Sequence, residues 1–524
     1  MKLIFTLGLI LILATPAHAA SEFTTNFNSL YTIKNTGETS VSHTITLKNN
    51  LAHIYATSYT IATGGDNLGA LAASDESGPI DAVTTTQNGN TTIQLSINNP
   101  KIGKDQVKTL NLSYTTDDVV ETIGDSITIN IPRLARANEA AEYTRTVRIE
   151  GQQDRDSLIY PLPNKTEPDG EYTVYTFEGH ANDSLTMLFG KSVTYKLNLT
   201  YELKNKDMNP IDSELALPPD TSYQHILLEN ISPPPQNIRL DNEGNWLARY
   251  NLKAGEKLLI KAELYATVYP KPTLYDPSTT TLVKTAHSKY WDPTAPSIVD
   301  LSAKLKTPEN IYNYLTTTLS YNYAGISSGG GRLGTLKALA SPTSVLCTEF
   351  TDVFVSLVRA RGIPAREING YGYTKNRSLQ PQNIGTDILH SWPEYYDETQ
   401  KTWVSVDPTW GHTTGGVNYF SKLDFSHLTF VRHGQEDSYP LPAGAYKSNP
   451  LDKYIQVDVA ESLPDSRTTS VIRDGVIYNT GNVALINAEV GYLPPYGSYK
   501  QPSPKSLSLY DKIRAICAKL LSKF

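Results

Sequence analysis

Apolar and polar residues alternate along several stretches of the first half of the chain. One such run holds Val41, His43, Ile45 and Leu47 at a period of two. Turn-forming residues separate the runs, a pattern typical of strands that bury one face. We therefore expect β-sandwich-type structure over residues 20–195 and a second all-β segment over residues 196–275. Two of the clearest strands should carry the series Val193, Tyr195, Leu197, Leu199, Tyr201, Leu203 and the series Leu258, Ile260, Ala262, Leu264, Ala266, Val268.

The apolar period changes to that of a helix after Pro270. Thr307 and Pro308 have the residue types of an N-cap and a first helical position. A longer stripe follows Cys347, and Gly362 then ends it. These patterns predict a helix-containing domain over residues 276–445, whose longest helix begins at Cys347. The stripe itself is Phe350, Val353, Phe354, Leu357 and Val358.

Alternation returns over residues 451–500, where we expect a small β-domain. Residues 505–524 carry one apolar helical face among basic residues, and they predict an amphipathic helix. Such a helix either docks on its own protein or lies on a membrane surface. We expect docking and no membrane association.

The first 19 residues have the order of a signal peptide. Lys2 is followed by an apolar run and then by Ala17, His18 and Ala19, as before a cleavage site. The run is short for a membrane-spanning helix, so we expect cleavage after Ala19 rather than a retained anchor. The mature protein is then secreted or extracytoplasmic.

Charge and cysteine content narrow the function further. With 46 basic and 53 acidic residues and no basic cluster, the chain gives no sign of a nucleic-acid partner. The two cysteines, Cys347 and Cys517, are too few for a disulfide framework, although one bridge between them stays open. Each is therefore a candidate for chemistry.

Cys347 is expected in the first turn of its helix. Unpaired N–H groups and the helix dipole favour an anion there, which would lower the pKa of the thiol. The same N–H groups could hold an oxyanion. The alternative is that Cys347 is a small buried core residue.

A predicted hairpin brings a histidine to an aspartate. Residues 390–396 and 402–407 have strand patterns around a polar loop. A loop centred on residue 399 pairs residues whose numbers sum to about 798, so His390 should lie opposite Asp407 or within one residue of it. A carboxylate at that distance can orient an imidazole. With Cys347 these residues would supply a nucleophile, a base and an orienting group.

Several motifs around these residues resemble the bacterial transglutaminase-like superfamily. They are Cys347-Thr348-Glu349-Phe350, Leu357 to Arg366, Gly370-Tyr371, His390-Ser391-Trp392-Pro393-Glu394-Tyr395 and Asp407-Pro408-Thr409-Trp410-Gly411. The resemblance covers residues 295–430 and implies an α+β fold, with a papain-like helix on an antiparallel sheet. It also implies catalytic roles for Cys347, His390 and Asp407, acting on amide bonds of a protein or peptide through a thioester.

The resemblance bears on neighbouring residues too. It implies that Trp392 and Trp410 wall the cleft, although both could be core aromatics, and that Arg366 supports the sheet. His412 is the rival base. We expect no cofactor and no metal, because His412, His427 and His433 lack paired spacing with carboxylates or thiols. We expect the glycine-rich residues 327–334 to be a flexible connection.

Three functions remain open at this point. Water could resolve the thioester, giving an amidase or peptidase, or an amine could resolve it, giving a crosslinking enzyme. The alternative is a non-catalytic extracellular binding or scaffold protein with a residual catalytic domain. Hydrolysis is the preferred interpretation.

Overall fold

The computed structural model describes residues 22–500, apart from 65–67, 88–89, 134–139, 152–156, 181–182, 279–286, 329–330, 375–379, 382–388 and 450. The chain divides into two compact units. Unit 1 comprises residues 1–121 and 129–187, and unit 2 comprises residues 122–128 and 188–524. The proposed signal peptide and the C-terminal helix lie outside the described residues.

Unit 1 is built around an eight-stranded sheet of order β13-β14-β11-β1-β2-β8-β4-β5. Its strands confirm the predicted alternation, since Val41, His43, Ile45 and Leu47 are all buried on β2. A three-stranded sheet of order β3-β7-β6 accompanies it. The bounds are β1 Phe23–Ile33, β2 Thr39–Asn49, β3 Ser58–Gly64, β4 Gly69–Asp75, β5 Gly78–Pro79, β6 Ala82–Gln87, β7 Asn90–Ser96, β8 Val107–Thr116, β11 Ala140–Glu150, β13 Lys165–Asp169 and β14 Tyr172–Glu178.

Four further strands lie near the unit boundaries, which fall within β9, β10 and β15. They are β9 Val120–Ile123, β10 Ser126–Ile131, β12 Ser157–Tyr160 and β15 Leu185–Phe189.

Unit 2 contains a four-stranded sheet of order β18-β21-β16-β26 and a three-stranded sheet of order β17-β20-β19. Both predicted alternating series form strands here, and β16 and β21 pair along their whole length. β26, from the expected 451–500 segment, pairs with β16 in the same sheet. The bounds are β16 Val193–Lys204, β17 Ile211–Leu217, β18 Gln224–Ser232, β19 Asn237–Leu240, β20 Trp246–Leu252, β21 Lys257–Val268 and β26 Ile455–Val459.

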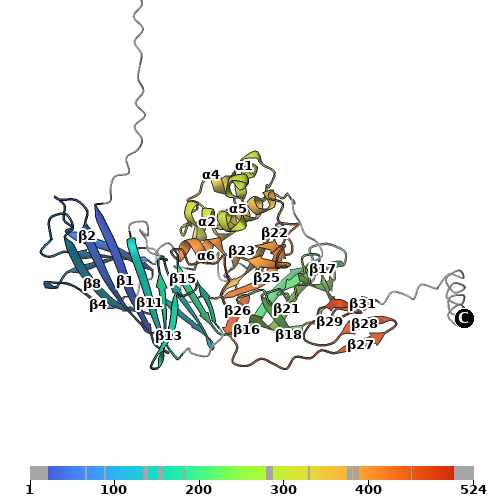
Figure 1. Ribbon diagram of the computed structural model, residues 1–524. Coiled ribbons are helices and arrows are strands. Elements are labelled where there is room, and N and C mark those ends of the chain that lie inside the picture. The colour runs from blue at the N-terminus through green and yellow to red at the C-terminus, as the bar shows by residue number, and fades with distance from the viewer. Residues whose placement is uncertain are drawn as a thin grey trace, which may run out of the picture. The chain divides into compact units, whose positions relative to one another are not determined.

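A helical layer and a second four-stranded sheet follow in the same unit. The sheet has the order β24-β23-β22-β25 and is antiparallel throughout. Figure 1 shows the helices α1, α2, α4 and α5 gathered on one side of it. The bounds are α1 Pro296–Leu305, α2 Pro308–Thr318, α3 Gly325–Ser328, α4 Thr335–Ala340, α5 Cys347–Ala360, β22 Ala365–Gly372, β23 His390–Asp397, β24 Thr402–Ser405, α6 Pro408–Thr413 and β25 His427–His433.

The helices begin where the sequence predicted. The Thr307 side chain accepts a hydrogen bond from the Asn310 N–H and Pro308 is the first residue of α2, while α5 begins at Cys347. Burial of the α5 stripe against α1, α2 and α4 builds the core of this layer. The predicted α+β class, with a helix on an antiparallel sheet next to all-β structure, is confirmed.

The last described residues form short strands. β27, β28 and β31 make one sheet and β29 and β30 another. No helix within the described ranges is long and apolar enough to cross a membrane. The bounds are β27 Ser470–Arg473, β28 Val476–Asn479, β29 Leu485–Asn487, β30 Gly491–Leu493 and β31 Ser498–Lys500.

Candidate active site

Cys347 is the first residue of α5, and Glu349 fixes that helix start. Glu349 Oε2 accepts from the Leu346 backbone N–H at 2.8 Å, and Oε1 accepts from the Leu333 N–H at 2.9 Å. A glutamate at this position satisfies an N–H group that the helix itself leaves unpaired. Cys347 is a free thiol with only 1% of its surface exposed.

The surroundings of Cys347 favour the neutral thiol. Burial raises the pKa of Cys347 to about 12, although a hydrogen bond from the Ser391 backbone lowers it. The negative charges of Glu349 and Asp407 raise it further. The predicted lowering of the pKa is therefore wrong for the thiol in this environment, because loss of water outweighs the helix start. A thiolate at Cys347 needs a positive partner beside it.

His390, the first residue of β23, is bonded to a carboxylate. Its Nε2 is 2.8 Å from Asp407 Oδ2, and both side chains are fully buried. Its Nδ1 is buried without a hydrogen-bond partner among the described residues. Because Asp407 holds the proton on Nε2, Nδ1 is the ring nitrogen free to accept one.

Ser391, the next residue, connects β23 to α5, the helix that begins at Cys347. Besides the backbone hydrogen bond to Cys347, its Oγ donates to Thr351 Oγ1 on α5 at 3.2 Å. The same hydroxyl is 2.8 Å from Glu367 Oε1 on β22. The contact partner of the sulfur is therefore the residue adjacent to His390.

The pairing of His390 with Asp407 is present, but its geometry differs from the prediction. β23 and β24 pair Glu394 with Ser405 and Asp397 with Thr402, a sum of 799. This register puts Asp407 across from residue 392, because the Val406 N–H bonds to the Pro393 carbonyl. Asp407 thus reaches His390 diagonally, from the residue where the strand gives way to α6.

Asp407 is held rigidly because it caps α6. Its Oδ1 accepts from the backbone N–H groups of Thr409 at 2.8 Å and Trp410 at 3.0 Å, which leaves Oδ2 for the imidazoles. Burial raises the pKa of Asp407, but His390 and His427 outweigh it and hold the pKa well below its usual range. The carboxylate is therefore ionised.

Trp392 and Trp410 stack on the imidazole of His390. The ring centroids are 5.6 Å apart for Trp392 and 4.7 Å for Trp410, with interplanar angles of 29° and 14°. Both indoles are buried, and Trp410 Nε1 donates to the Pro381 carbonyl at 3.2 Å. They restrict the ring of His390, and their role as walls of a substrate cleft stays a prediction.

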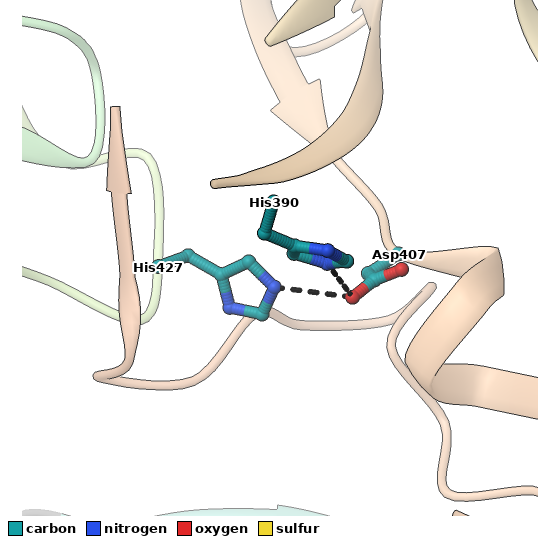
Figure 2. Close-up of side chains that lie close together, drawn as sticks. All are labelled: His390, Asp407 and His427. Carbon is teal, nitrogen blue, oxygen red and sulfur yellow. Dashed lines mark hydrogen bonds and ion pairs between the residues drawn. The ribbon is translucent and has the colours of Figure 1, made fainter. Parts of the chain in front are cut away.

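A second histidine, His427 at the start of β25, belongs to the site. Its Nε2 is 3.2 Å from Asp407 Oδ2 and its Nδ1 is 2.7 Å from Asp424 Oδ1. Figure 2 shows both imidazoles directed at the Asp407 carboxylate. Burial lowers the pKa of His427, but Asp424 and Asp407 outweigh this and raise it to about 9. His427 is therefore an imidazolium at neutral pH.

His427 was not predicted as a site residue, and His412 was the expected rival base. His412 instead places Nδ1 2.9 Å from the Thr316 carbonyl and its ring against Phe350. The one local signal for His427 was Asp424, three residues before it. The expectation that His427 has no carboxylate at useful spacing is wrong.

A family comparison covers part of this region of the chain. Residues 294–408 match the model described as the transglutaminase-like superfamily. This part of the chain is a transglutaminase-like domain. The match includes Cys347, His390 and Asp407, and it ends before Asp424 and His427. No curated protein matched the chain.

Solved structures were also compared with the chain. A candidate cysteine protease from Cytophaga hutchinsonii is 15% identical with a TM-score of 0.32, covering 52% of this chain and 87% of its own. The periplasmic domain of TgpA from Pseudomonas aeruginosa, bound to ethylmercury, is 14% identical with a TM-score of 0.24, covering 42% and 91%. An M1 zinc metallopeptidase from Deinococcus radiodurans is 10% identical with a TM-score of 0.23, covering 36% and 45%. At these scores the superpositions carry no functional inference.

His390, Asp407 and His427 of the transglutaminase-like site also have the spacing of a metal-binding group. One ligand atom of each lies within 4.8 Å of the others. A metal would need both imidazoles as unprotonated donors. The two carboxylates keep His427 protonated, and both rings are already bonded to Asp407. The chemistry of these residues favours a hydrogen-bonded chain.

A buried arginine, Arg366, braces the sheet of the transglutaminase-like domain. Arg366 on β22 pairs closely with Glu394, donates to Ser278 Oγ at 2.8 Å and stacks 3.9 Å above Trp403. Arg366 therefore supports the sheet, as predicted.

Arg332 braces the glycine-rich segment. It pairs closely with Asp352 on α5 and lies 3.1 Å from Glu367 on β22. Arg332 therefore anchors the described C-terminal part of the glycine-rich segment, whereas residues 329 and 330 of the expected flexible connection lie outside the described residues.

Proposed function

We propose that the chain is a cysteine enzyme that cleaves or transfers amide-bonded acyl groups of proteins or peptides. Cys347 is the nucleophile, His390 the general base and acid, and Asp407 the group that orients His390. The observation that carries the proposal is the state of His390. Its Nε2 is bonded to an ionised Asp407, while its buried Nδ1 has no partner among the described residues.

The reaction follows from these roles. His390 Nδ1 takes the proton of Cys347 Sγ, and the resulting imidazolium supplies the positive charge that the buried thiolate needs. The sulfur attacks the amide carbonyl carbon, and the C–N bond breaks as His390 returns the proton to the leaving nitrogen. Ammonia or an amine departs, leaving an acyl thioester on Cys347.

A second nucleophile completes the cycle. His390 Nδ1 takes a proton from water or from an amine, whose oxygen or nitrogen attacks the thioester carbonyl. The C–S bond then breaks, and the proton returns to Cys347. Water gives hydrolysis and an amine gives a new amide bond. We favour hydrolysis, and acceptor choice depends on which of the two reaches the thioester.

The experiment is an activity assay on the mature protein. A short glutamine-containing peptide is incubated with and without an added primary amine, while ammonia is measured enzymatically and products by mass spectrometry. Ammonia release that disappears in Cys347→Ala supports the proposal. An amine adduct identifies transfer, and free acid identifies hydrolysis. Equal ammonia release by wild type and Cys347→Ala would refute it.

One observation is equally consistent with the alternative of a non-catalytic binding protein. Cys347 is buried with its pKa raised to about 12, which suits a structural thiol as well as a resting enzyme. The assay separates the two, because a residual domain gives no Cys347-dependent product from any amide.

The proposal places the reaction outside the cytoplasm. The charged, apolar and small-residue order of residues 1–19 supports export. N-terminal sequencing of exported protein should give a start at Ala20, and an exported protein that still begins at Met1 would contradict it.

A further inference from the structure

The triad leaves one buried group of the site unexplained. Among the described residues, no hydrogen bond joins His427 or Asp424 to Cys347 or to its neighbours in the chain. Both side chains are nevertheless buried, Asp424 contacts His427, and His427 contacts Asp407. Burying an imidazolium costs free energy unless carboxylates compensate it. A group kept charged at this cost needs a physical reason.

The contacts form a single chain of hydrogen bonds. Asp424 Oδ1 is 2.7 Å from His427 Nδ1, His427 Nε2 is 3.2 Å from Asp407 Oδ2, and that same oxygen is 2.8 Å from His390 Nε2. Asp424 is itself fixed, because its Oδ1 also accepts from the Ser426 backbone N–H at 2.8 Å. His427 therefore links a fixed carboxylate to the one that orients the base.

We infer that His427 is a positioning residue, held by Asp424, that fixes Asp407 Oδ2 at the place where it accepts from His390 Nε2. This inference deepens the proposed function and rests on it. Without the second donor, Oδ2 would have His390 as its single partner, and Asp407 would be held only by the two hydrogen bonds of Oδ1 at the start of α6. His427 also balances part of the Asp407 charge.

The charge of His427 is set by few groups. Asp424 faces it from the loop before β25, Asp407 from the start of α6, and His390 from β23, with ring centroids 5.7 Å apart. Lys422 interacts electrostatically with Asp424. The two carboxylates dominate, because the pKa of His427 is raised to about 9 despite burial.

Glutamine and asparagine at position 427 separate the two hydrogen bonds. A glutamine amide N–H lies near the place of Nε2 and can still donate to Asp407, whereas an asparagine N–H lies near Nδ1 and can donate only to Asp424. Each variant removes the charge and one hydrogen bond to a carboxylate. Their losses of stability should therefore be similar, and their activities should differ.

The test measures kcat and KM for ammonia release from the glutamine-containing peptide by wild type, His427→Gln and His427→Asn. His427→Gln should keep most of kcat. His427→Asn should lose roughly ten- to hundredfold in kcat at unchanged KM, the range typical when a partner that orients a functional side chain is removed. Equal activity of the two variants, or higher activity of His427→Asn, would overturn the inference.

A second variant covers the case in which both substitutions prevent folding. Asp424→Asn keeps an oxygen for His427 Nδ1 but removes the charge, so His427 should lose its proton at lower pH. The neutral ring can still donate from Nε2 to the Asp407 carboxylate, so Asp424→Asn, like His427→Gln, should keep most of kcat at unchanged KM. A roughly ten- to hundredfold loss of kcat in Asp424→Asn would show that the charge of His427 acts on the site rather than its hydrogen bond, and would overturn the inference.

Failure of the proposed function would give a different result. If the wild type releases no ammonia, rates of Cys347 alkylation by iodoacetamide replace turnover in the comparison. A slower rate in His427→Asn than in His427→Gln supports the positioning role. Equal rates in all three proteins refute it.

Discussion

Replacing Asp407 by asparagine tests the orientation of His390 most directly. Asp407 accepts four hydrogen bonds, two at Oδ1 from the start of α6 and two at Oδ2 from His390 and His427. Asparagine has only one side-chain oxygen. The two N–H groups at the start of α6 need an acceptor, so they take this oxygen. Its NH₂ group must therefore face the imidazoles and make His390 Nε2 an acceptor. The ring proton then sits on Nδ1, where it blocks proton transfer from Cys347.

The expected loss follows from this change of tautomer. In the serine-protease triad the corresponding substitution lowers kcat by about 10⁴, equivalent to about 5.4 kcal/mol of activation free energy. We expect a loss of about 10³ to 10⁴ in kcat for Asp407→Asn, less than for Cys347→Ala. KM should change little, because Asp407 is buried and orients the base rather than binding the substrate.

Stability provides an independent readout through its pH dependence. A raised pKa in the folded state means that the charge of His427 stabilises the protein fully below its unfolded pKa of about 6.5. This stabilisation is lost as the pH rises through the folded value of about 9. It amounts to roughly 3 kcal/mol, at about 1.36 kcal/mol per pKa unit. Asp407→Asn removes one of the two carboxylates and should shrink this pH-dependent loss.

The assay combines ammonia release with urea unfolding at pH 6.5 and pH 9.5. Asp397→Asn is the matched control, because Asp397 also accepts backbone N–H bonds, from Thr399 at 2.7 Å and Gln400 at 3.0 Å, but in an exposed turn of the same hairpin. The control should retain activity. If Asp407→Asn keeps more than a tenth of kcat, Asp407 does not set the tautomer of His390.

Three further predictions use other contacts. Because burial raises the pKa of Cys347 to about 12, its alkylation by iodoacetamide should accelerate steadily from pH 7 to pH 10 in mass-mapped labelling; a plateau below pH 8 would contradict this. Dialysis against EDTA should leave ammonia release unchanged, and a loss that zinc restores would show a metal at His390 and His427. Arg366→Met should lower the free energy of unfolding in urea by about 3–5 kcal/mol, because it leaves buried carboxylates unpaired. The control Arg239→Met breaks an exposed pair with Glu214 and should lower the free energy of unfolding by less than about 1 kcal/mol. Equal losses in the two variants would refute the role of Arg366.

Local signals explain what could be predicted from the sequence. The N-cap at Thr307, the start of α5 at Cys347 and the alternation in β16 each depend on residues close together in the chain. The pairing of His390 with Asp407 was accessible for the same reason, since one hairpin joins them. Helix period, capping residues and strand alternation are sufficient for such features.

The error in the predicted register of β23 and β24 comes from the turn that joins them. The hairpin has a four-residue loop, 398–401, because Asp397 still pairs with Thr402 while its side chain caps the turn. Lys401 adopts a φ of 55°, an uncommon value for a residue other than glycine. The sequence only weakly indicates such a conformation. Because the observed loop is one residue shorter than the predicted loop, the register shifts and Asp407 is no longer opposite His390 or within one residue of it.

Tertiary contacts account for the features that were missed. His427 reaches Asp407 across 20 residues of chain, and burial of Cys347 depends on the whole helical layer. The prediction of a thiolate took account of the helix start but not of the burial of Cys347. Burial is the largest influence on the pKa of this thiol. Neither quantity is visible before the chain is folded.

The contacts of Arg432 also limit which segment of this chain can be moved by recombination without losing buried pairs. Arg432 on β25 pairs with Asp276 at 2.9 Å and donates to the Gly244 carbonyl at 2.6 Å, so the sheet that carries His390 takes a counter-charge from a residue that precedes the family match. A recombination event that moved residues 294–408 alone would leave behind Asp276, and also Asp424 and His427. Recombination between genes should therefore keep the segment from β16 to β25 together. This segment is longer than residues 294–408, which match the family model.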